Sequence, residues 1–207
     1  MNTRRVLLLT LVAFAAFASS GCGYNTLTSK QQNVRRSWAD VESRLQRRAD
    51  LVPNLVAAAQ SAGVQEQEVF GQIAEARSRL LNATNAQGQG EGGDKTPEQR
   101  QAVIDAANSF GGTLGRLLSL QEAYPQLQSN ELWRNVQTEL AGTENRINVA
   151  REDYNRAIQD YNTARGQFPM VIAAKLYGFK EEPYFQAEAG SREAPRIDPN
   201  TMRRNQN

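Results

Sequence analysis

Few side chains in this sequence could carry covalent or acid–base chemistry. The 207 residues include one cysteine, Cys22, and no histidine. These counts exclude disulfides within the chain, zinc sites of the usual cysteine–histidine kind and triads that use imidazole as the base. The carboxylates that could form an acid–base pair or a metal site fall in one stretch: Glu139, Glu144, Glu152 and Asp153. Because Glu-x-x-His, phosphate-loop and nucleophile-elbow motifs are absent, we interpret these carboxylates as a solvated helix face. We therefore expect no enzyme activity, cofactor or metal.

Cys22 follows a segment with the three-part layout of a secretory signal. Arg4 and Arg5 precede an apolar run of 13 residues, 6–18, which only Thr10 interrupts, and small residues at 19–21 come directly before the cysteine. A membrane-spanning helix needs roughly 20 apolar residues, so the run suits a signal that is cleaved. We predict that residues 1–21 are a lipoprotein signal peptide.

Small residues immediately before a cysteine resemble a bacterial lipobox, in which the thiol is acylated and the chain is cut before the cysteine. Ser19 departs from this pattern, because leucine or valine is usual three positions before the cysteine. The alternative is an ordinary signal peptide with an incidental cysteine. The position of the only thiol at the junction favours lipidation of Cys22 with acyl chains such as palmitate. Two or three such chains would anchor the protein on the extracytoplasmic face of a membrane, with residues 22–28 as a tether.

The charge balance gives the mature chain no strong field. The sequence has 24 Lys and Arg against 22 Asp and Glu, and removal of Arg4 and Arg5 leaves 22 against 22. We therefore expect no nucleic-acid partner. A local basic cluster remains, with acidic residues interleaved: Arg35, Arg36, Arg44, Arg47 and Arg48. We interpret it as helix-surface ion pairs, with contact to anionic lipid as the alternative.

Apolar residues spaced alternately by three and four predict long helices that pack along a coiled-coil-like seam. The first such stretch predicts a helix from Val34 to Leu80 that bends at Pro53. Residues 82–95 are rich in Gly, Asn and Gln and predict a flexible loop. Thr96 then has the pattern of a helix cap.

The helix that begins after Thr96 is stopped by Pro125, and Ser129 or Asn130 begins the next one, which extends to Phe168. A short helix at 170–177, with Gly178 as its stop, and a disordered polar tail at 187–207 complete the chain. The predicted fold class is therefore all-α. Residues 29–186 should form an elongated antiparallel bundle of three to four long helices with a kinked first helix.

Two Tyr-Asn pairs recur seven residues apart, so that Tyr154 stacks over Tyr161 and Asn155 over Asn162. The interpretation that we favour is structural: the rings fill the core, and the amides reach polar groups around Asp50 and Asn54 and set the helix register. In the alternative, the amides line a groove for an extended peptide and use donor and acceptor together. The candidate interaction residues are Asn54, Tyr154, Asn155, Tyr161 and Asn162.

Taken together, several short motifs resemble the LemA family. The resemblance covers Tyr24 to Phe185, and it implies an antiparallel helical bundle attached to the cell envelope, without implying a particular reaction. Many members keep an uncleaved N-terminal helix as their anchor, whereas lipid on Cys22 would serve here. The motifs are Tyr24-Asn25, Trp38, the run Arg47 to Val56, Glu122 to Leu127, Thr143-Glu144, Ile147, Arg151, the two Tyr-Asn pairs, Phe168-Pro169, Gly178-Phe179 and Tyr184-Phe185.

These observations predict an envelope-anchored, non-enzymatic interaction or scaffold module that binds an envelope protein of unknown identity. Two alternatives come from other classes. A hydrolase of envelope polymers would need two converging carboxylates in a cleft. A membrane-remodelling protein would expose a basic, apolar helix to lipid.

Overall fold

The computed structural model describes residues 3–90 and 93–185, with side chains described from residue 23 onward. The side chain of Cys22, those of the predicted signal peptide and the predicted tail at 187–207 lie outside the described residues. Within the described part, every regular element is a helix. None of these helices, over the side chains described, is long and apolar enough to cross a membrane.

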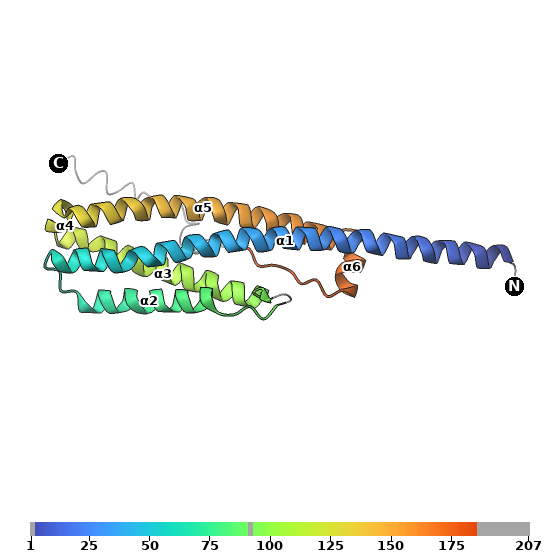
Figure 1. Cartoon of the computed structure of the whole chain (residues 1–207), viewed down its shortest axis with the longest axis horizontal. Coiled ribbons are helices and arrows are strands. Elements are labelled where there is room, and N and C mark those ends of the chain that lie inside the picture. Colours follow the sequence, from blue (N-terminus) through green and yellow to red (C-terminus); the bar gives the residue numbers. More distant parts are fainter. Residues whose placement is uncertain (1–2, 91–92, 186–207) are drawn as a thin grey trace, which may run out of the picture.

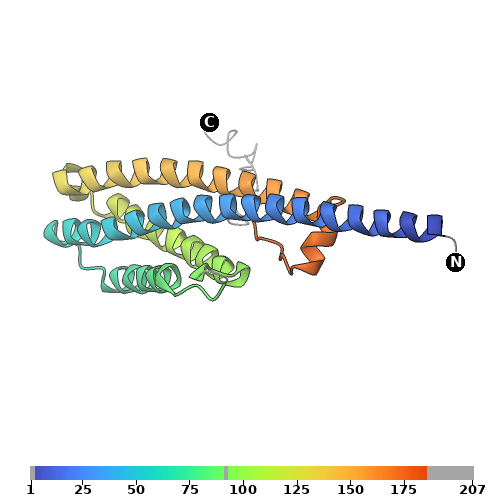
Figure 2. The same ribbon diagram turned by 45° about the vertical axis from the view of Figure 1, so that its right-hand side comes forward.

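Four long helices run antiparallel to their neighbours in the chain and form an elongated bundle (Figure 1). The helices are α1 (Thr3–Ser61), α2 (Gln67–Asn85), α3 (Pro97–Ala123) and α5 (Glu131–Gly166), with the short α4 (Gln126–Ser129) and α6 (Met170–Leu176) at the two ends of α5. At 1.5 Å per residue, α1 extends roughly 90 Å. It packs mainly on α5, while α2 packs on α3 (Figure 2). The prediction of an elongated, all-α bundle with three to four long helices is confirmed.

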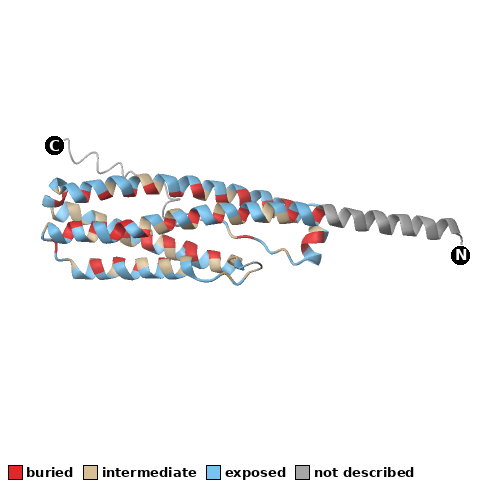
Figure 3. Cartoon of the chain, viewed as in Figure 1, coloured by how far each residue is buried: buried red, intermediate tan, exposed pale blue. Residues whose placement is uncertain are grey.

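The predicted seams form the core of the bundle. Figure 3 shows the buried positions recurring along the inward faces of the long helices. The α5 seam is buried almost throughout, and both tryptophans lie in the core, with exposed fractions of 3% for Trp38 and 0% for Trp133. On α1 the buried seam residues are Val34, Trp38, Val41, Leu45, Val52, Leu55 and Ala59.

The prediction of one helix from Val34 to Leu80 is wrong, because α1 ends at Ser61 and α2 folds back beside it. Gly63 has a positive φ of 83°, which a residue with a Cβ rarely adopts. Its N–H donates to the Gln60 carbonyl at 3.0 Å, and the N–H of Val64 donates to the Ala59 carbonyl at 3.1 Å. These two bonds form a Schellman motif, which ends the helix and reverses the chain.

The helix α1 continues through Pro53. Proline has no N–H, so the carbonyl of Ala49, four residues earlier, loses its helical partner. The Arg77 side chain of α2 replaces that partner, because its Nε donates to the Ala49 carbonyl at 2.8 Å. A side chain from the neighbouring helix thus compensates for the proline.

Other boundaries differ from the prediction by short lengths. Residues 22–28 were predicted to be a tether, but they are part of α1, and Leu27 is fully buried against α6 and the end of α5. The loop predicted at 82–95 begins later, because α2 extends to Asn85. The capping box at Thr96 and the cap at Asn130 are confirmed, since each side chain accepts a backbone N–H of the first turn that follows.

Candidate functional site

The Tyr-Asn repeat of α5 binds residues 180–185 of the same chain, which we call the strap. The amide of Asn155 donates to the Phe185 carbonyl at 3.0 Å and accepts from the Phe185 N–H at 2.8 Å. The amide of Asn162 makes the same pair of bonds with Glu182, at 3.1 and 3.2 Å. Each asparagine therefore satisfies both backbone groups of one strap residue.

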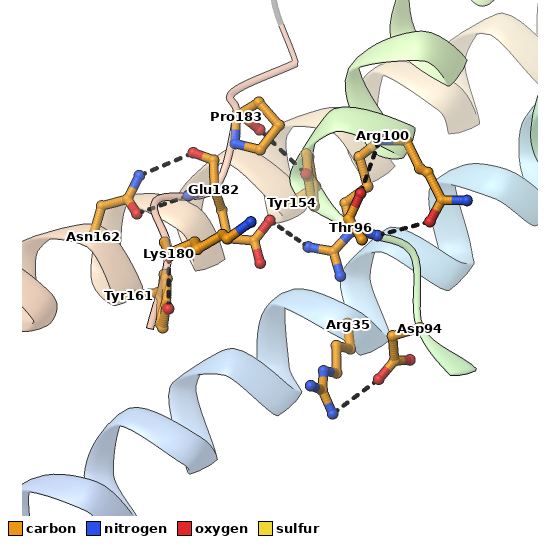
Figure 4. A network of polar contacts seen from close by, with 11 residues as sticks. Arg35, Asp94, Thr96, Arg100, Tyr154, Tyr161, Asn162, Lys180, Glu182 and Pro183 are labelled. Carbon is orange, nitrogen blue, oxygen red and sulfur yellow. Dashed lines mark hydrogen bonds and ion pairs between the residues drawn. The ribbon is translucent and has the colours of Figure 1, made fainter. Parts of the chain in front are cut away.

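The two tyrosines bind the backbone of the strap through their hydroxyl groups (Figure 4). Tyr154 donates to the Pro183 carbonyl at 3.2 Å, and Tyr161 donates to the Lys180 carbonyl at 2.8 Å. Both rings are fully buried. Burial disfavours the phenolate, so it raises the pKa of Tyr161 to about 12 and raises that of Tyr154 further.

The repeat length of the helix matches the spacing of the strap. Asn162 is seven positions after Asn155 on the helix, which corresponds to roughly 10.5 Å along the helix axis. Phe185 is three positions after Glu182, and an extended chain covers three positions in about 10 Å. Pro183 lies between them and holds the preceding residue in the extended region. Pro183 has no backbone N–H, but neither asparagine accepts a hydrogen bond at position 183, so no bond to the repeat is lost.

The strap is also held from α3 by a buried ion pair. The Nη1 of Arg100 lies 2.6 Å from Oε2 of Glu182, and the two side chains are only 2% and 5% exposed. Burial raises the pKa of Glu182, and the charge of Arg100 opposes that effect. The guanidinium also lies 5.9 Å from the ring centroid of Trp38, which packs against Tyr154. Arg100 of α3 and Asn162 of α5 thus both bind Glu182 (Figure 4), and Trp38 of α1 packs against Arg100 and Tyr154.

Side chains of α5 also fix both ends of the strap. Phe185 is buried, and the guanidinium of Arg151 lies 4.3 Å from the centroid of its ring. Near the start, Arg165 pairs with Glu181 at 2.7 Å. The strap therefore packs as an integral part of the bundle.

Of the four carboxylates that could have done acid–base chemistry, Glu139, Glu144 and Asp153 pair with arginines, and Glu152 is exposed on α5. Glu139 pairs with Arg47, and Glu144 lies 2.7 Å from Arg48. Across the described residues, no group of three or more acidic or cysteine side chains could hold a metal ion. Within the basic cluster, Arg44 pairs with Asp40 one turn earlier on α1 at 3.1 Å, as the helix-surface interpretation predicts, whereas Arg47 and Arg48 pair across to α5.

The structure corrects the partner that we favoured for the Tyr-Asn repeat. The amides do not reach the region of Asp50 and Asn54, and Asn54 lies exposed on α1. Each amide binds an extended backbone through its donor and its acceptor together, as the peptide-groove alternative predicts. The bound backbone is the strap of the same chain and not a separate peptide. The favoured interpretation also expected both tyrosine rings to lie in the core, and both rings are buried.

Sequence reasoning missed the residues that the repeat binds and the ion pair with α3. Arg100 stands three residues before Val103 on the apolar seam of its helix, and an arginine at a core position is a sign of a buried partner. Glu182, directly before a proline, is in a stretch without periodicity. No local signal connects it with Arg100 or Asn162.

The comparisons with known proteins agree with this architecture. The sequence profile of the LemA family matches residues 37–198. Two magnetosome proteins of Paramagnetospirillum magneticum, MamQ 1 and MamQ 2, are each 30% identical over 203 residues, which cover 92% of this chain and 74% of the relative. The magnetosome protein MamQ of Magnetospirillum gryphiswaldense is 28% identical over the same shares. The profile match spans most of the bundle, including the Tyr-Asn repeat and the strap that it binds, and the chain therefore belongs to the LemA family.

Proposed function

We propose that this protein is a lipid-anchored, non-enzymatic helical module of the cell envelope that binds protein partners. The observation that carries the proposal is the position of Cys22. It is the only thiol, it follows a signal-like segment, and it directly precedes Gly23, which is buried in the bundle. Acylation there would attach the end of a long, rigid body to a membrane on its extracytoplasmic face.

The partners of the carboxylates and of the Tyr-Asn repeat support a binding role. The carboxylates Glu139 and Glu144 pair with arginines, and the Tyr-Asn repeat is occupied by the strap. These arrangements give an interaction role more support than hydrolysis. The MamQ relatives, too, are named for a cellular structure and not for a reaction.

Two surfaces are candidates for the partner. One is Asn54 on the exposed face of α1. The other is an open pocket of about 380 Å³ between the strap and the start of α3, which Tyr184 lines while its neighbours Pro183 and Phe185 are held by α5. In this proposal the Tyr-Asn repeat acts on partner binding indirectly, because it fixes the position of Tyr184.

Anchoring can be tested by growing bacteria that express the full-length chain with an alkyne-tagged fatty acid. The wild-type protein should incorporate the tag and remain with the membrane fraction, and Cys22→Ser should do neither. Equal labelling of the two proteins would overturn the lipid anchor.

Partner binding can be tested with a photo-cross-linking residue at position 54 or 184 in cells. A discrete adduct of higher mass should form at one of these positions but not at Ser78, an exposed residue on α2 that serves as the control. If Asn155→Ala with Asn162→Ala removes the adduct at 184 but not one at 54, the strap surface is the site. The absence of adducts at both positions would contradict a binding role.

A further inference from the structure

Large apolar side chains lie exposed at the α6 end of the bundle. Ile172 and Leu176, one turn apart on α6, are 53% and 68% exposed, and Phe168, at the corner before α6, is 80% exposed. Tyr177 follows at 53%, and its ring packs at 4.8 Å against that of Tyr24 on α1. Most of the exposed large hydrophobic residues among the described side chains gather here.

The helix α6 places its small residues inward and its large apolar residues outward. Ala173 and Ala174 are buried against Leu27 of α1 and Ala164 of α5. Globular proteins usually bury their large apolar side chains and leave small or polar ones outside. The reversed arrangement in α6 indicates that its outer face meets an apolar environment.

The position of α6 identifies that environment. Figures 1 and 2 both place α6 beside α1, at the end of the bundle from which the N-terminal part of α1 leaves. A Cβ on Gly23 would lie 3.3 Å from the Cβ of Ala173 and 3.7 Å from Met170. The residue after Cys22 is thus in direct contact with α6, so acyl chains on Cys22 would enter the bilayer next to this surface.

We propose that the outer face of α6, formed by Phe168, Ile172, Leu176 and Tyr177, inserts into the interfacial region of the membrane that holds the lipid anchor. The proposal rests on the proposed lipidation of Cys22. The exposed Lys175 lies on the same short helix, and its ammonium group suits the phosphates of anionic lipid. Tyr24 and Tyr177 have the amphipathic rings that are enriched at this depth. Contact between α6 and lipid would give the elongated bundle a defined orientation at the membrane surface.

The experiment places a fluorophore on single introduced cysteines, because acylation would block the only native thiol. Full-length protein with Leu176→Cys or Leu132→Cys is isolated from membranes, labelled with an environment-sensitive dye and reconstituted into vesicles of phosphatidylethanolamine and phosphatidylglycerol. Leu132 is the matched control, since it is an exposed leucine (48%) near the other end of α5. Some of the lipids carry a nitroxide near the headgroup. Quenching should be several-fold stronger at 176 than at 132.

A variant with Phe168→Ser and Ile172→Ser tests the surface itself. Both side chains are exposed, so the melting temperature should not change, while quenching at position 176 should fall toward the control value. Equal quenching at 176 and 132 in the parent protein would overturn the inference. A blue-shifted dye at 176 without nitroxide quenching would do the same, because it would show that protein covers the surface, either a partner or a second copy.

The intact mass of each reconstituted sample separates this inference from the proposed lipid anchor. An acylated protein without quenching at 176 would overturn the α6 contact and leave the anchor in place. A sample without acyl mass would remove the anchor, and because its Cys22 would then also take the dye, positions 176 and 132 are compared in a Cys22→Ser background, where stronger quenching at 176 would still support the α6 contact. If the sample has neither acyl mass nor quenching, both proposals fail.

Discussion

Asn155 on α5 pairs with both backbone groups of Phe185, accepting its N–H at 2.8 Å and donating to its carbonyl at 3.0 Å. Asn162 repeats this arrangement one heptad later on Glu182. A helix surface thus carries a backbone-recognition repeat, and the chain itself supplies the ligand. The consequence is that the strap, although it has no helical periodicity, is bound to α5 through its backbone at Lys180, Glu182, Pro183 and Phe185.

Replacing both asparagines should release the strap. Asn155→Ala with Asn162→Ala removes four hydrogen bonds, and at about 1 kcal/mol for each bond the free energy of unfolding should fall by about 2–4 kcal/mol. Urea denaturation measures this change, and hydrogen exchange should show that the amides of Glu182 and Phe185 lose protection. Asn54→Ala, at an exposed position, is the control and should change the free energy of unfolding by less than about 0.5 kcal/mol. Unchanged protection at 182 and 185 would contradict the assigned role of the repeat.

Breaking the buried ion pair on one side should cost more than removing it on both sides. Arg100→Met leaves Glu182 buried without its cation, and a loss of about 3–5 kcal/mol of unfolding free energy is expected. Adding Glu182→Leu should recover much of that loss, because it removes the unpaired charge. Denaturation of the two single variants and the double variant gives the coupling free energy. Simple additivity of the two changes would mean that the pair does not act as a unit.

The contribution of Arg77 to the free energy of unfolding should depend on the presence of Pro53. Arg77→Ala leaves the Ala49 carbonyl without a partner and should cost about 1 kcal/mol of unfolding free energy. In a Pro53→Ala background the helix regains its own N–H donor for that carbonyl, so the same change should cost less. Thermal or urea denaturation of the four proteins measures the difference. An equal cost in both backgrounds would show that Arg77 stabilises the hairpin by other means.

The buried Tyr161 predicts a loss of stability in alkali. Its pKa is raised from 10.0 to about 12, so the unfolded chain releases this proton at a lower pH than the folded protein does. The stabilisation is therefore fully present below pH 10.0 and is lost as the pH rises through about 12. Denaturation at increasing pH should show the decline, and in Tyr161→Phe it should be smaller. Titration of tyrosinate absorbance in the folded protein near the ordinary value would argue against the burial.

The helical seams could be predicted from the sequence because each buried side chain recurs at a local spacing of three or four residues. The same spacing concealed the turn at Gly63, since the residues between α1 and α2 happen to preserve the register. Only the glycine, which allows a positive φ, marked the break. The seven-residue Tyr-Asn repeat predicted stacked amides, but its partner lies about 20 to 30 residues away in a stretch without a pattern, so the contact with Glu182 could not be predicted.

The central functional claim is that lipid on Cys22 anchors the bundle, and the intact mass of protein purified from cell membranes tests it most directly. A mass equal to the chain from Cys22 onward plus a diacylglyceryl group on the thiol, with or without a third acyl chain on the new amino group, is expected, because the signal would be cut before the lipidated cysteine. Cys22→Ser should remain as unprocessed precursor with an unchanged melting temperature, since Cys22 lies outside the apolar seams that the sequence predicts. A wild-type protein that begins at Met1, or one that begins near Cys22 without added lipid mass, would contradict the claim.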